Sequence, residues 1–392
     1  SIIGIKIKQE LSLSDTQFGL LVATPILTGS ISRLPLGIMT DRFGGRIVFF
    51  IQMLLVALPT YGLAFADQYW HYLVIGLFVG LAGGSFAIGI TYTSAWFEHR
   101  RQGTAMGIFG AGNAGAAITN LVAPLIVVSF GWRMVPQIYS LAMICMAIIF
   151  WLFTFPDPKQ LERDRTGTHF RLADQLAPLK EMRVWRFGIY YFFVFGGFVA
   201  LALWLPKYYV GEYGLDLKTA SLITMCFTLP SGLIRAFGGW LSDKYGARHV
   251  NWLVFWVSLI CLFLVSYPQT TYIVHGISGD HTFYIGSNIW FFTFLIFVIG
   301  IAQGIGKASV YRIIHDYYPN NMGSVGGLVG VIGGLGGFVL PILFGLASDF
   351  LDIRTSCFML LFGVVALCMI MMHISIRNMR QKSGLELTEN FT

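Results

Sequence analysis

Long apolar stretches fill most of the chain, and short segments rich in charge, glycine or proline separate them. Several stretches exceed the roughly 20 apolar residues that a helix needs to cross a bilayer. The strict alternation of apolar and polar residues that is typical of a membrane β-barrel is not found. The pattern predicts an all-α membrane protein with eleven complete spans, at about 16–40, 47–65, 70–97, 103–130, 134–155, 187–209, 220–241, 250–266, 289–315, 323–348 and 353–376.

Composition supports a membrane protein and argues against other classes. Of the 392 residues, 56% are hydrophobic and 11% are charged, whereas a soluble domain carries about 25% charged residues. The five cysteines lie in apolar stretches without the spacing of a metal site or a disulfide framework. The sequence has neither a pattern of nucleophile and base nor a nucleotide-binding loop that would indicate an enzyme. We therefore expect no enzyme activity, no cofactor and no metal.

A repeated motif divides the chain into two halves. Residues 33–46 read RLPLGIMTDRFGGR and residues 235–248 read RAFGGWLSDKYGAR, so Arg, Gly, Asp, Gly and Arg each recur 202 residues later. A polar segment with seven Lys or Arg residues separates the halves. We expect two six-helix bundles, with a first helix that lies mostly before Ser1. The predicted parts are an N-terminal helical bundle at 1–156, a cytoplasmic linker at 157–186, a C-terminal helical bundle at 187–378 and a cytoplasmic tail at 379–392.

The basic residues outside the spans are distributed unevenly. Sixteen lie on the side of Asp41, the linker and the C-terminal tail, and six lie on the other side. The positive-inside rule places the side with sixteen, hereafter the basic side, in the cytoplasm. The same rule explains the net charge of +7 without nucleic-acid binding. We therefore predict a multi-pass protein of the cell inner (plasma) membrane, with the linker and the C-terminus cytoplasmic.

Two arginines lie inside predicted spans at matching positions of the repeat. Arg33 is eight residues from Asp41, roughly 12 Å along a helix, and so lies near the bilayer midplane; the repeat places Arg235 at the same depth. All nineteen acidic residues fall in loops, tails or the last turn of a span. A bound anion is then the natural counter-ion of the two guanidinium groups. Snorkelling of each arginine to the interface is the alternative.

Two further basic residues lie in one span. Lys307 is about nine residues from the basic end of its helix, and a desolvated lysine can exchange a proton, so a role in coupling is the hypothesis. Snorkelling is again the alternative. Arg312 lies four residues before Asp316, which predicts a local pair on the helix surface.

The repeated aspartates lie at the basic ends of their helices. We expect Asp41 and Asp243 to gate the pathway rather than bind a substrate, and the alternative is simple pairing with their basic neighbours. The other members of this predicted gating group are Arg42, Arg46, Lys244 and Arg248.

Two predicted spans are rich in glycine: residues 103–115 read GTAMGIFGAGNAG and residues 323–341 read GSVGGLVGVIGGLGGFVLP. Small residues allow close helix packing and also let the backbone approach a small ligand, while Asn113 supplies an amide. Together with residues 80–86, GLAGGSF, these segments resemble the signatures of the nitrate/nitrite porters (NarK-like) of the major facilitator superfamily. The segment 37–46 and its repeat resemble the loop motif of the whole superfamily.

The resemblance implies a secondary active transporter that imports nitrate by alternating access. It matches Arg33 and Arg235 to the anion-binding arginines, and it matches the lining of the site to Tyr191, Phe195, Phe86 and Asn113. The segment 306–309, GKAS, resembles the nitrate/proton symport branch. The implied partners are nitrate or nitrite, protons and the lipid bilayer. The alternatives are nitrate/nitrite exchange, transport of another small anion such as an organophosphate or carboxylate, and a transport-inactive membrane sensor.

Overall fold

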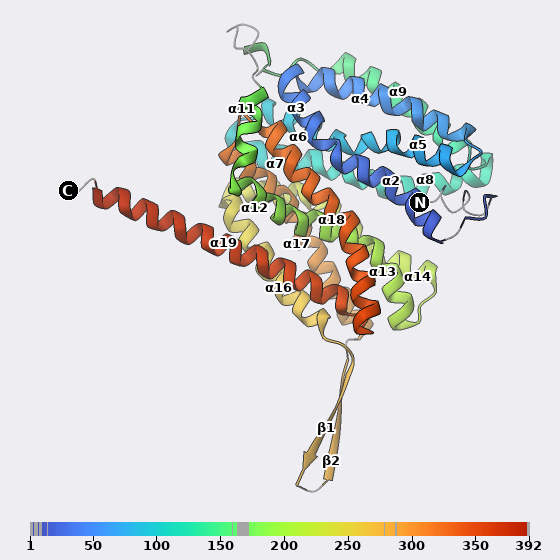
Figure 1. Cartoon of the computed structure of the whole chain (residues 1–392), viewed down its shortest axis with the longest axis vertical. Helices are drawn as coiled ribbons and strands as arrows, with labels where there is room; N and C mark the ends of the chain where they lie inside the picture. The colour runs from blue at the N-terminus through green and yellow to red at the C-terminus, as the bar shows by residue number, and fades with distance from the viewer. Residues whose placement is uncertain are drawn as a thin grey trace.

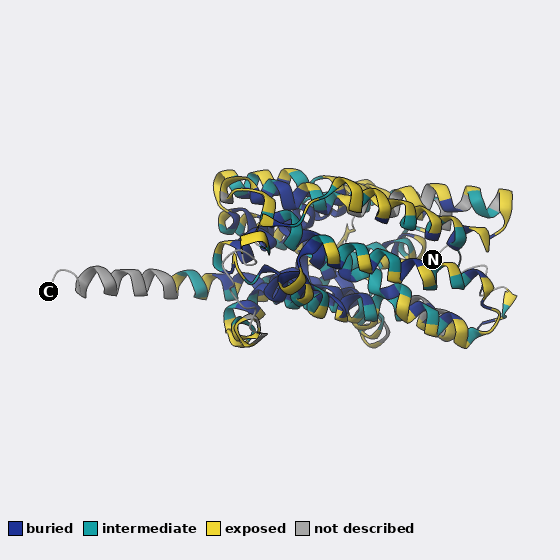
Figure 2. Ribbon diagram, turned by 90° about the horizontal axis from the view of Figure 1, so that it is seen from above, coloured by how far each residue is buried: buried dark blue, intermediate teal, exposed yellow. Residues whose placement is uncertain are grey.

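The computed structural model describes the chain apart from residues 1–2, 4–6, 8–9, 14, 159, 163–171, 278, 287 and 390–392. It is an assembly of helices packed side by side, with the first and second halves of the chain next to each other (Figure 1). Exposed residues lie on the outside of the assembly and buried residues lie within it (Figure 2). Many of the exposed residues are large and apolar. This distribution suits a protein whose outer surface contacts lipid.

The first half contains α-helices joined by short 3₁₀ turns, which are labelled η. Its elements are α2 (Asp15–Ile31), α3 (Arg33–Phe43), α4 (Gly45–Gly62), η1 (Leu63–Phe65), α5 (Tyr69–Gly80), η2 (Leu81–Gly84), α6 (Ser85–Trp96), η3 (His99–Arg101), α7 (Gln102–Gly110), η4 (Ala111–Ala114), α8 (Gly115–Phe130) and α9 (Met134–Phe153).

The connecting segment and the second half continue the helical pattern, with one π-helical turn, η6, and one pair of strands. Their elements are α11 (Leu172–Leu176), η5 (Ala177–Lys180), α12 (Met182–Tyr191), η6 (Phe192–Gly196), α13 (Gly197–Tyr213), α14 (Leu217–Leu233), α15 (Arg235–Tyr245), α16 (Ala247–Ser266), β1 (Thr270–Gly276), β2 (Gly279–Ile285), α17 (Ile289–Tyr317), α18 (Met322–Leu351) and α19 (Ser356–Glu389).

Within the described residues, eight helices are long and apolar enough to cross a membrane. A ninth is added if α14 and α15, which meet at an angle of 42°, form one span. The eleven complete spans predicted from the sequence are therefore not confirmed. The predicted span 16–40 is divided between α2 and α3, and the predicted span 103–130 is divided among α7, η4 and α8.

The chemistry of these breaks is local. Pro35, in the first turn of α3, has no N–H to donate to the preceding turn, so the helical ladder is interrupted there. In the other divided span, glycines at 110, 112 and 115 remove the side chains that favour a continuous α-helix. The apolar pattern predicts that both segments are helical, but it does not show where each helix breaks.

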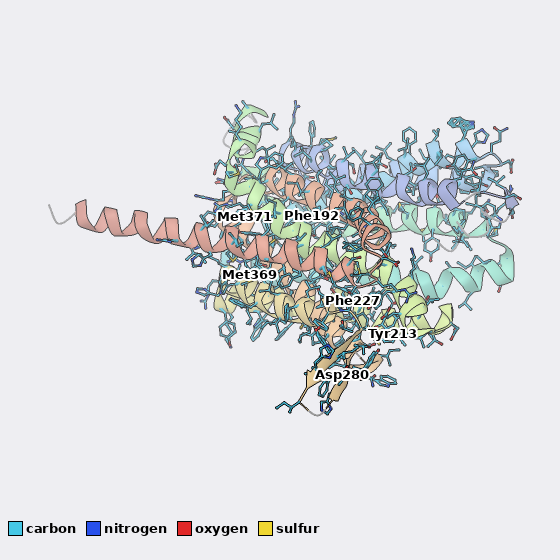
Figure 3. The ribbon with its side chains drawn as sticks, turned by 60° about the horizontal axis from the view of Figure 1, so that its bottom comes forward. Phe192, Tyr213, Phe227, Asp280, Met369 and Met371 are labelled. Carbon is cyan, nitrogen blue, oxygen red and sulfur yellow. The ribbon has the colours of Figure 1, made fainter. Side chains whose placement is uncertain are left out.

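A β-hairpin that the apolar pattern did not predict projects from the second half. β1 and β2 pair antiparallel from Thr270 with Ile285 to Gly276 with Gly279. The hairpin extends beyond the helices at the end opposite α11 (Figure 1), and Asp280 lies on it (Figure 3). Its Thr, Tyr, Ile and Val residues favour strands. The segment connects two apolar helices and is too short and too polar to form a span itself.

The two halves contact each other through two equivalent helix pairs. α3 of the first half packs against α18 of the second, and α15 of the second half packs against α7 of the first. A Cβ atom added at Gly37 would lie 2.1 Å from the Gly323 carbonyl oxygen, and one added at Gly239 would lie 2.0 Å from that of Gly103. Glycine therefore allows the backbones of each pair to meet. These crossings position the site described next.

Candidate functional site

Two broken helices place the arginines of the repeat in the interior. Arg33 is the first residue of α3 and Arg235 is the first residue of α15, each directly after a break. Arg33 is 8% exposed and Arg235 is 1% exposed. Neither side chain reaches the surface by snorkelling, which was the alternative interpretation of the sequence.

Glycines on the opposite half make room for each arginine. A Cβ atom at Gly110 of α7 would lie 2.2 Å from Arg235 Nε, and one at Gly330 of α18 would lie 3.0 Å from Arg33 Cδ. About one turn earlier, a Cβ atom added at Gly107 would lie 2.6 Å from the Arg235 carbonyl oxygen, and one added at Gly327 would lie 2.8 Å from that of Arg33.

These glycines form a second repeat that the motif comparison missed. Gly103, Gly107 and Gly110 recur as Gly323, Gly327 and Gly330, each 220 residues later. The glycine-rich helices thus allow the close packing that was expected of them, and they also bring backbone to the buried cations. Their approach to a small ligand stays a prediction.

Arg33 is satisfied by protein groups. Its Nε donates to the Gly83 carbonyl at 3.2 Å and its Nη1 donates to the Gly330 carbonyl at 2.8 Å. Its guanidinium carbon lies 4.9 Å from the ring centroid of Phe195, which belongs to the other half. Two carbonyl oxygens and an aromatic face therefore offset part of the cost of burying this charge.

Arg235 is not satisfied by the part of the chain that the structure describes. Its Nε, Nη1 and Nη2 are all buried, and none has a hydrogen-bond partner there. The guanidinium carbon lies 4.4 Å from the ring centroid of Phe86, again from the other half. A buried cation with three unused donor atoms is costly, and a bound anion would supply the missing acceptors.

A series of aromatic contacts connects the two arginines. Tyr191 stacks on Phe195 with centroids 5.1 Å apart and planes 4° apart. Tyr311 contacts Tyr191 edge-on at 5.0 Å and Phe86 edge-on at 5.3 Å. The buried hydroxyl of Tyr191 has no hydrogen-bond partner among the described residues. The structure thus brings together three of the four predicted lining residues, Tyr191, Phe195 and Phe86.

Tyr311 contributes to the site without having been predicted, whereas Asn113 was predicted to line it. Tyr311 lies one helical turn after Lys307 on α17. Its ring contacts Phe86 of the first half and Tyr191 of the second half. The spacing from Lys307 is the signal that could have found it. Asn113, the fourth predicted lining residue, lies in η4, but its side chain is outside the described residues.

Lys307 is buried on α17, with 1% of its surface exposed. Its Nζ donates to the Ser231 hydroxyl at 3.1 Å and lies 3.1 Å from the ring centroid of Phe198. Gly80 and Gly84 recur 220 residues later as Gly300 and Gly304, and the same register pairs Ala87 with Lys307. The second half therefore adds an interior cation where the first half has a methyl group.

The repeated aspartates each bind the start of a helix in the opposite half. Asp41 accepts from the backbone N–H groups of Gly323 and Ser324 at 3.2 and 3.1 Å, at the start of α18. Asp243 accepts from the N–H groups of Gly103 and Thr104 at 2.9 and 2.7 Å, at the start of α7. A carboxylate at a helix N-terminus is favoured by the unpaired N–H groups and by the helix dipole.

Asp243 has two additional contacts. It accepts from the Thr104 hydroxyl at 2.8 Å and forms an ion pair with Arg312 Nε at 2.8 Å. Arg312 also pairs with Asp316, so the local pair predicted from their four-residue spacing is confirmed. The link to Asp243 was not predicted, because it joins residues that are distant in the sequence.

The other predicted gating residues lie around these contacts. The Arg42 guanidinium lies 4.9 Å from the ring centroid of Phe43, and Lys244 Nζ lies 5.0 Å from that of Trp240. Arg46 and Arg248 are joined to other helices. Arg46 donates to the Trp151 carbonyl at 2.6 Å, and Arg248 donates to the Tyr317 hydroxyl.

The site has no metal-binding character in the described part of the chain. No group of three or more His, Cys, Asp or Glu side chains there could hold a metal ion. The groups that converge are two guanidinium ions, an ammonium ion and aromatic rings, which suit a small anion.

Comparisons with known proteins identify the family of the chain. The family model described as Major Facilitator Superfamily matches residues 1–279 and 219–389. The Thermus thermophilus protein named "Probable nitrate/nitrite antiporter NarK1" is 39% identical over 405 residues, which cover 100% of this chain and 90% of that protein. The Bacillus subtilis (strain 168) "Nitrite extrusion protein" is 30% identical, with coverages of 88% and 81%. The Staphylococcus aureus (strain Newman) "Probable nitrate transporter NarT" is also 30% identical, with coverages of 92% and 87%.

Solved structures share the fold at lower identity. The superfamily transporter FucP in the outward conformation matches with a TM-score of 0.69 at 15% identity, covering 93% of this chain and 91% of FucP. The human organic anion transporter MFSD10 matches with a TM-score of 0.69 at 16% identity, with coverages of 94% and 88%. The chain therefore belongs to the major facilitator superfamily of membrane transporters and, within it, to the nitrate/nitrite porter family.

Proposed function

We propose that the protein transports nitrate across the membrane and binds it between Arg33 and Arg235. The observation that carries this proposal is the guanidinium group of Arg235, which is 1% exposed and has no hydrogen-bond partner among the described residues. Nitrate is planar, carries one negative charge and offers three acceptor oxygens. It can complete the Arg235 fork and remain within reach of Arg33 from the opposite half.

The series of aromatic contacts favours a flat ion over a bulky one. Phe86 and Phe195 each face one of the arginines, and Tyr191 and Tyr311 fill the space beside them. An organophosphate or a carboxylate with a bulky body would have to displace these rings. Nitrite shares the charge and the planarity, so we propose it as a second substrate, in line with the names of the relatives.

The proposed membrane arrangement keeps the eleven spans. The broken pairs α2 with α3 and α14 with α15, and the interrupted segment from α7 to α8, each cross the bilayer together, with the breaks lying at the site. We place the basic side in the cytoplasm, with 157–186 as the linker between bundles at 1–156 and 187–378, and with a cytoplasmic tail at 379–392. The linker residues 163–171 lie outside the described part of the chain.

Alternating access follows from the contacts between the halves. Asp41 and Asp243 hold the basic ends of α18 and α7 in the opposite half, so this conformation is closed toward the proposed cytoplasmic side. An anion between Arg33 and Arg235 would offset the repulsion of two cations on different halves. Binding then favours states in which both halves contact the anion, and this difference can drive the change of access.

We propose that Lys307 couples a proton to nitrate import. It is buried like the two arginines. Within the described part of the chain its Nζ donates to the neutral Ser231 hydroxyl, whereas the buried Arg312 is paired with aspartates. An anion on the two arginines supplies negative charge that favours a proton on Lys307, so anion and proton would move together. Nitrate/nitrite exchange is the second candidate. It is favoured by the absence of a carboxylate among the described contacts of Arg33, Arg235 and Lys307, and by the name of the Thermus thermophilus relative.

Uptake by the purified protein in liposomes tests the proposal. Nitrate should accumulate inside when the lumen is alkaline, nitrite should compete, and a sugar or an organophosphate should not. Liposomes without protein are the control. No nitrate uptake under any gradient would refute the proposed function. Uptake that requires trapped nitrite and ignores the pH gradient would replace symport by exchange.

A further inference from the structure

A second group of arginines surrounds a cavity at the basic end of the second half. The cavity has a volume of about 240 Å³ and lies between α12, α16, α17 and α19. Arg183 and Arg186 reach it from α12, Arg248 from α16 and Tyr317 from α17. None of these residues belongs to the Arg33 and Arg235 site. Arg248 is a member of the predicted gating group, but the contacts between the halves described above are made by Asp41 and Asp243.

Guanidinium groups make up much of the polar lining of the cavity. Those of Arg183 and Arg248 lie 4.6 and 5.8 Å from the ring centroid of Tyr317, and Arg248 also donates to the Tyr317 hydroxyl. Arg186 has a buried Nε with no hydrogen-bond partner in the described residues. The described residues that line the cavity include no Asp or Glu.

The acids nearest in the sequence have partners of their own, and Glu181 and Arg183 share the Tyr318 hydroxyl. Glu181 accepts from the Tyr318 hydroxyl at 2.5 Å, and Asp316 pairs with Arg312. The buried Arg186 Nε lacks an acceptor within the described ranges of the chain. An anion with several acceptor oxygens would supply one and would also favour the close approach of neighbouring guanidinium groups. A phosphate group has this chemistry.

The surroundings of the cavity indicate that the phosphate belongs to a lipid. Met182 and Trp185, on the first turn of α12, are 73% and 48% exposed, and Ile374 on α19 is 51% exposed. Apolar and tryptophan side chains beside basic residues are typical of the membrane interface. Basic pockets between spanning helices on the cytoplasmic side bind the headgroups of acidic lipids.

We propose that this cavity binds the phosphate headgroup of an anionic phospholipid in the leaflet of the basic side. The acyl chains lie outside it, along the exposed apolar surfaces of α12 and α19. The lipid joins the start of α12, which follows the connecting segment, to α16 and to the end of α17. It therefore fixes the second half of the transporter in its membrane without entering the transport site.

Native mass spectrometry of the full chain in mixed micelles tests this proposal. The protein is titrated with phosphatidylglycerol or with phosphatidylcholine, and the ratio of the two affinities is measured. We expect wild type to prefer phosphatidylglycerol, and each change among Arg183→Gln, Arg186→Gln and Arg248→Gln to lower that preference about fivefold, at about 1 kcal/mol for a basic residue near the surface. Arg186→Lys, which keeps the charge, should retain most of the preference.

The matched control is Arg377→Gln, which removes an exposed charge from α19 that does not line the cavity. It should leave the preference unchanged. The proposal is wrong if Arg186→Gln and the triple variant prefer phosphatidylglycerol as strongly as wild type does. It is also wrong if inorganic phosphate at the same concentration raises the melting temperature as much as the lipid does, because the site would then bind free phosphate. Should the triple variant not fold, the single Arg186→Gln variant decides.

Discussion

Arg33 and Arg235 occupy the same position of an internal repeat, yet the protein treats them differently. Both begin a helix after a break, both are buried, and both face an aromatic ring from the opposite half. Arg33 donates to two carbonyl oxygens, whereas the three donor atoms of Arg235 have no partner in the described residues. The comparison shows that one half supplies a cation already held in place, while the other supplies a cation that requires a ligand.

The surroundings explain the difference. The first half has Gly83 beside Arg33, and its carbonyl accepts from Arg33 Nε. In the second half the position 220 residues later is Gln303, whose side chain donates instead to the Phe193 carbonyl at 3.3 Å. The second half also adds Lys307 where the first has Ala87. Unpaired donors and extra positive charge are thus concentrated on the Arg235 side.

The largest expected effect is the loss of transport when either arginine is removed. We predict that Arg33→Ala and Arg235→Ala each weaken nitrate binding by at least a hundredfold, since two charge-assisted hydrogen bonds contribute about 3 kcal/mol or more. Initial rates of nitrate uptake in liposomes measure this. Arg354→Ala, which removes an exposed arginine paired with Glu212, is the control and should transport normally. Normal uptake by either interior variant would refute the site.

A smaller effect is expected from the glycines that face the arginines. Gly110→Ala places a Cβ atom 2.2 Å from Arg235 Nε, whereas Gly330→Ala places one 3.0 Å from Arg33 Cδ. Because the Arg235 guanidinium must move, we predict about a tenfold higher KM for Gly110→Ala, and about a threefold increase for Gly330→Ala, from contact losses on the order of 1 kcal/mol. Equal effects, or a larger one at Gly330, would show that the two arginine pockets are alike.

The gate offers a second contrast between the halves. Asp243 accepts from two N–H groups, the Thr104 hydroxyl and Arg312, while two N–H groups of α18 donate to Asp41. We predict that Asp243→Asn speeds amide hydrogen exchange at the start of α7 but not of α18, and that Asp41→Asn speeds it at the start of α18 but not of α7, because the neutral amide is the weaker acceptor.

Hydrogen exchange read by mass spectrometry of peptides covering 102–110 and 322–330 measures this difference. Asp280→Asn on the hairpin, an exposed position, should change neither peptide. The contacts between the halves would be contradicted if Asp243→Asn speeded exchange in 322–330, or if Asp41→Asn speeded exchange in 102–110.

The smallest change in overall transport is expected at Lys307. Lys307→Ala gives the second half the residue that the first half has at Ala87, and removes a buried cation. We predict that exchange of internal for external nitrate remains within about threefold of wild type, since both arginines remain, while the response to a pH gradient is lost. The control is Lys207→Ala, which removes a lysine that lies over the Trp204 ring, away from the basic side. A pH response that survives in Lys307→Ala would exclude this lysine from coupling.

Much of this arrangement could be predicted from the sequence. The repeat identified Arg33 and Arg235 as a pair, because a motif that recurs at one spacing carries position as well as chemistry. Apolar runs predicted helices along nearly all of both halves. They did not predict the breaks beside the arginines or the hairpin at 270–285, since hydrophobicity alone does not report where a helical ladder is interrupted.

Other features depend on contacts across the whole fold. The binding of Asp41 and Asp243 to helices of the opposite half joins residues more than a hundred positions apart. The same is true of Tyr311, which contacts Phe86 from the first half. The second repeat, of glycines 220 residues apart, was present in the sequence and could have predicted these crossings. Its register differs from 202 because the segments that connect the helices differ in length.

The most direct measurement of the central claim compares melting temperatures with and without nitrate. In its absence, Arg235→Met should melt above wild type, because an apolar side chain replaces a buried cation without partners, a change worth about 1–4 kcal/mol. Arg33→Met should melt below wild type, because the Gly83 and Gly330 carbonyls lose their donor. Nitrate should raise the melting temperature of wild type but not that of either variant. If Arg235→Met melts below wild type without nitrate, or still responds to nitrate, Arg235 is not the cation that the transported anion completes.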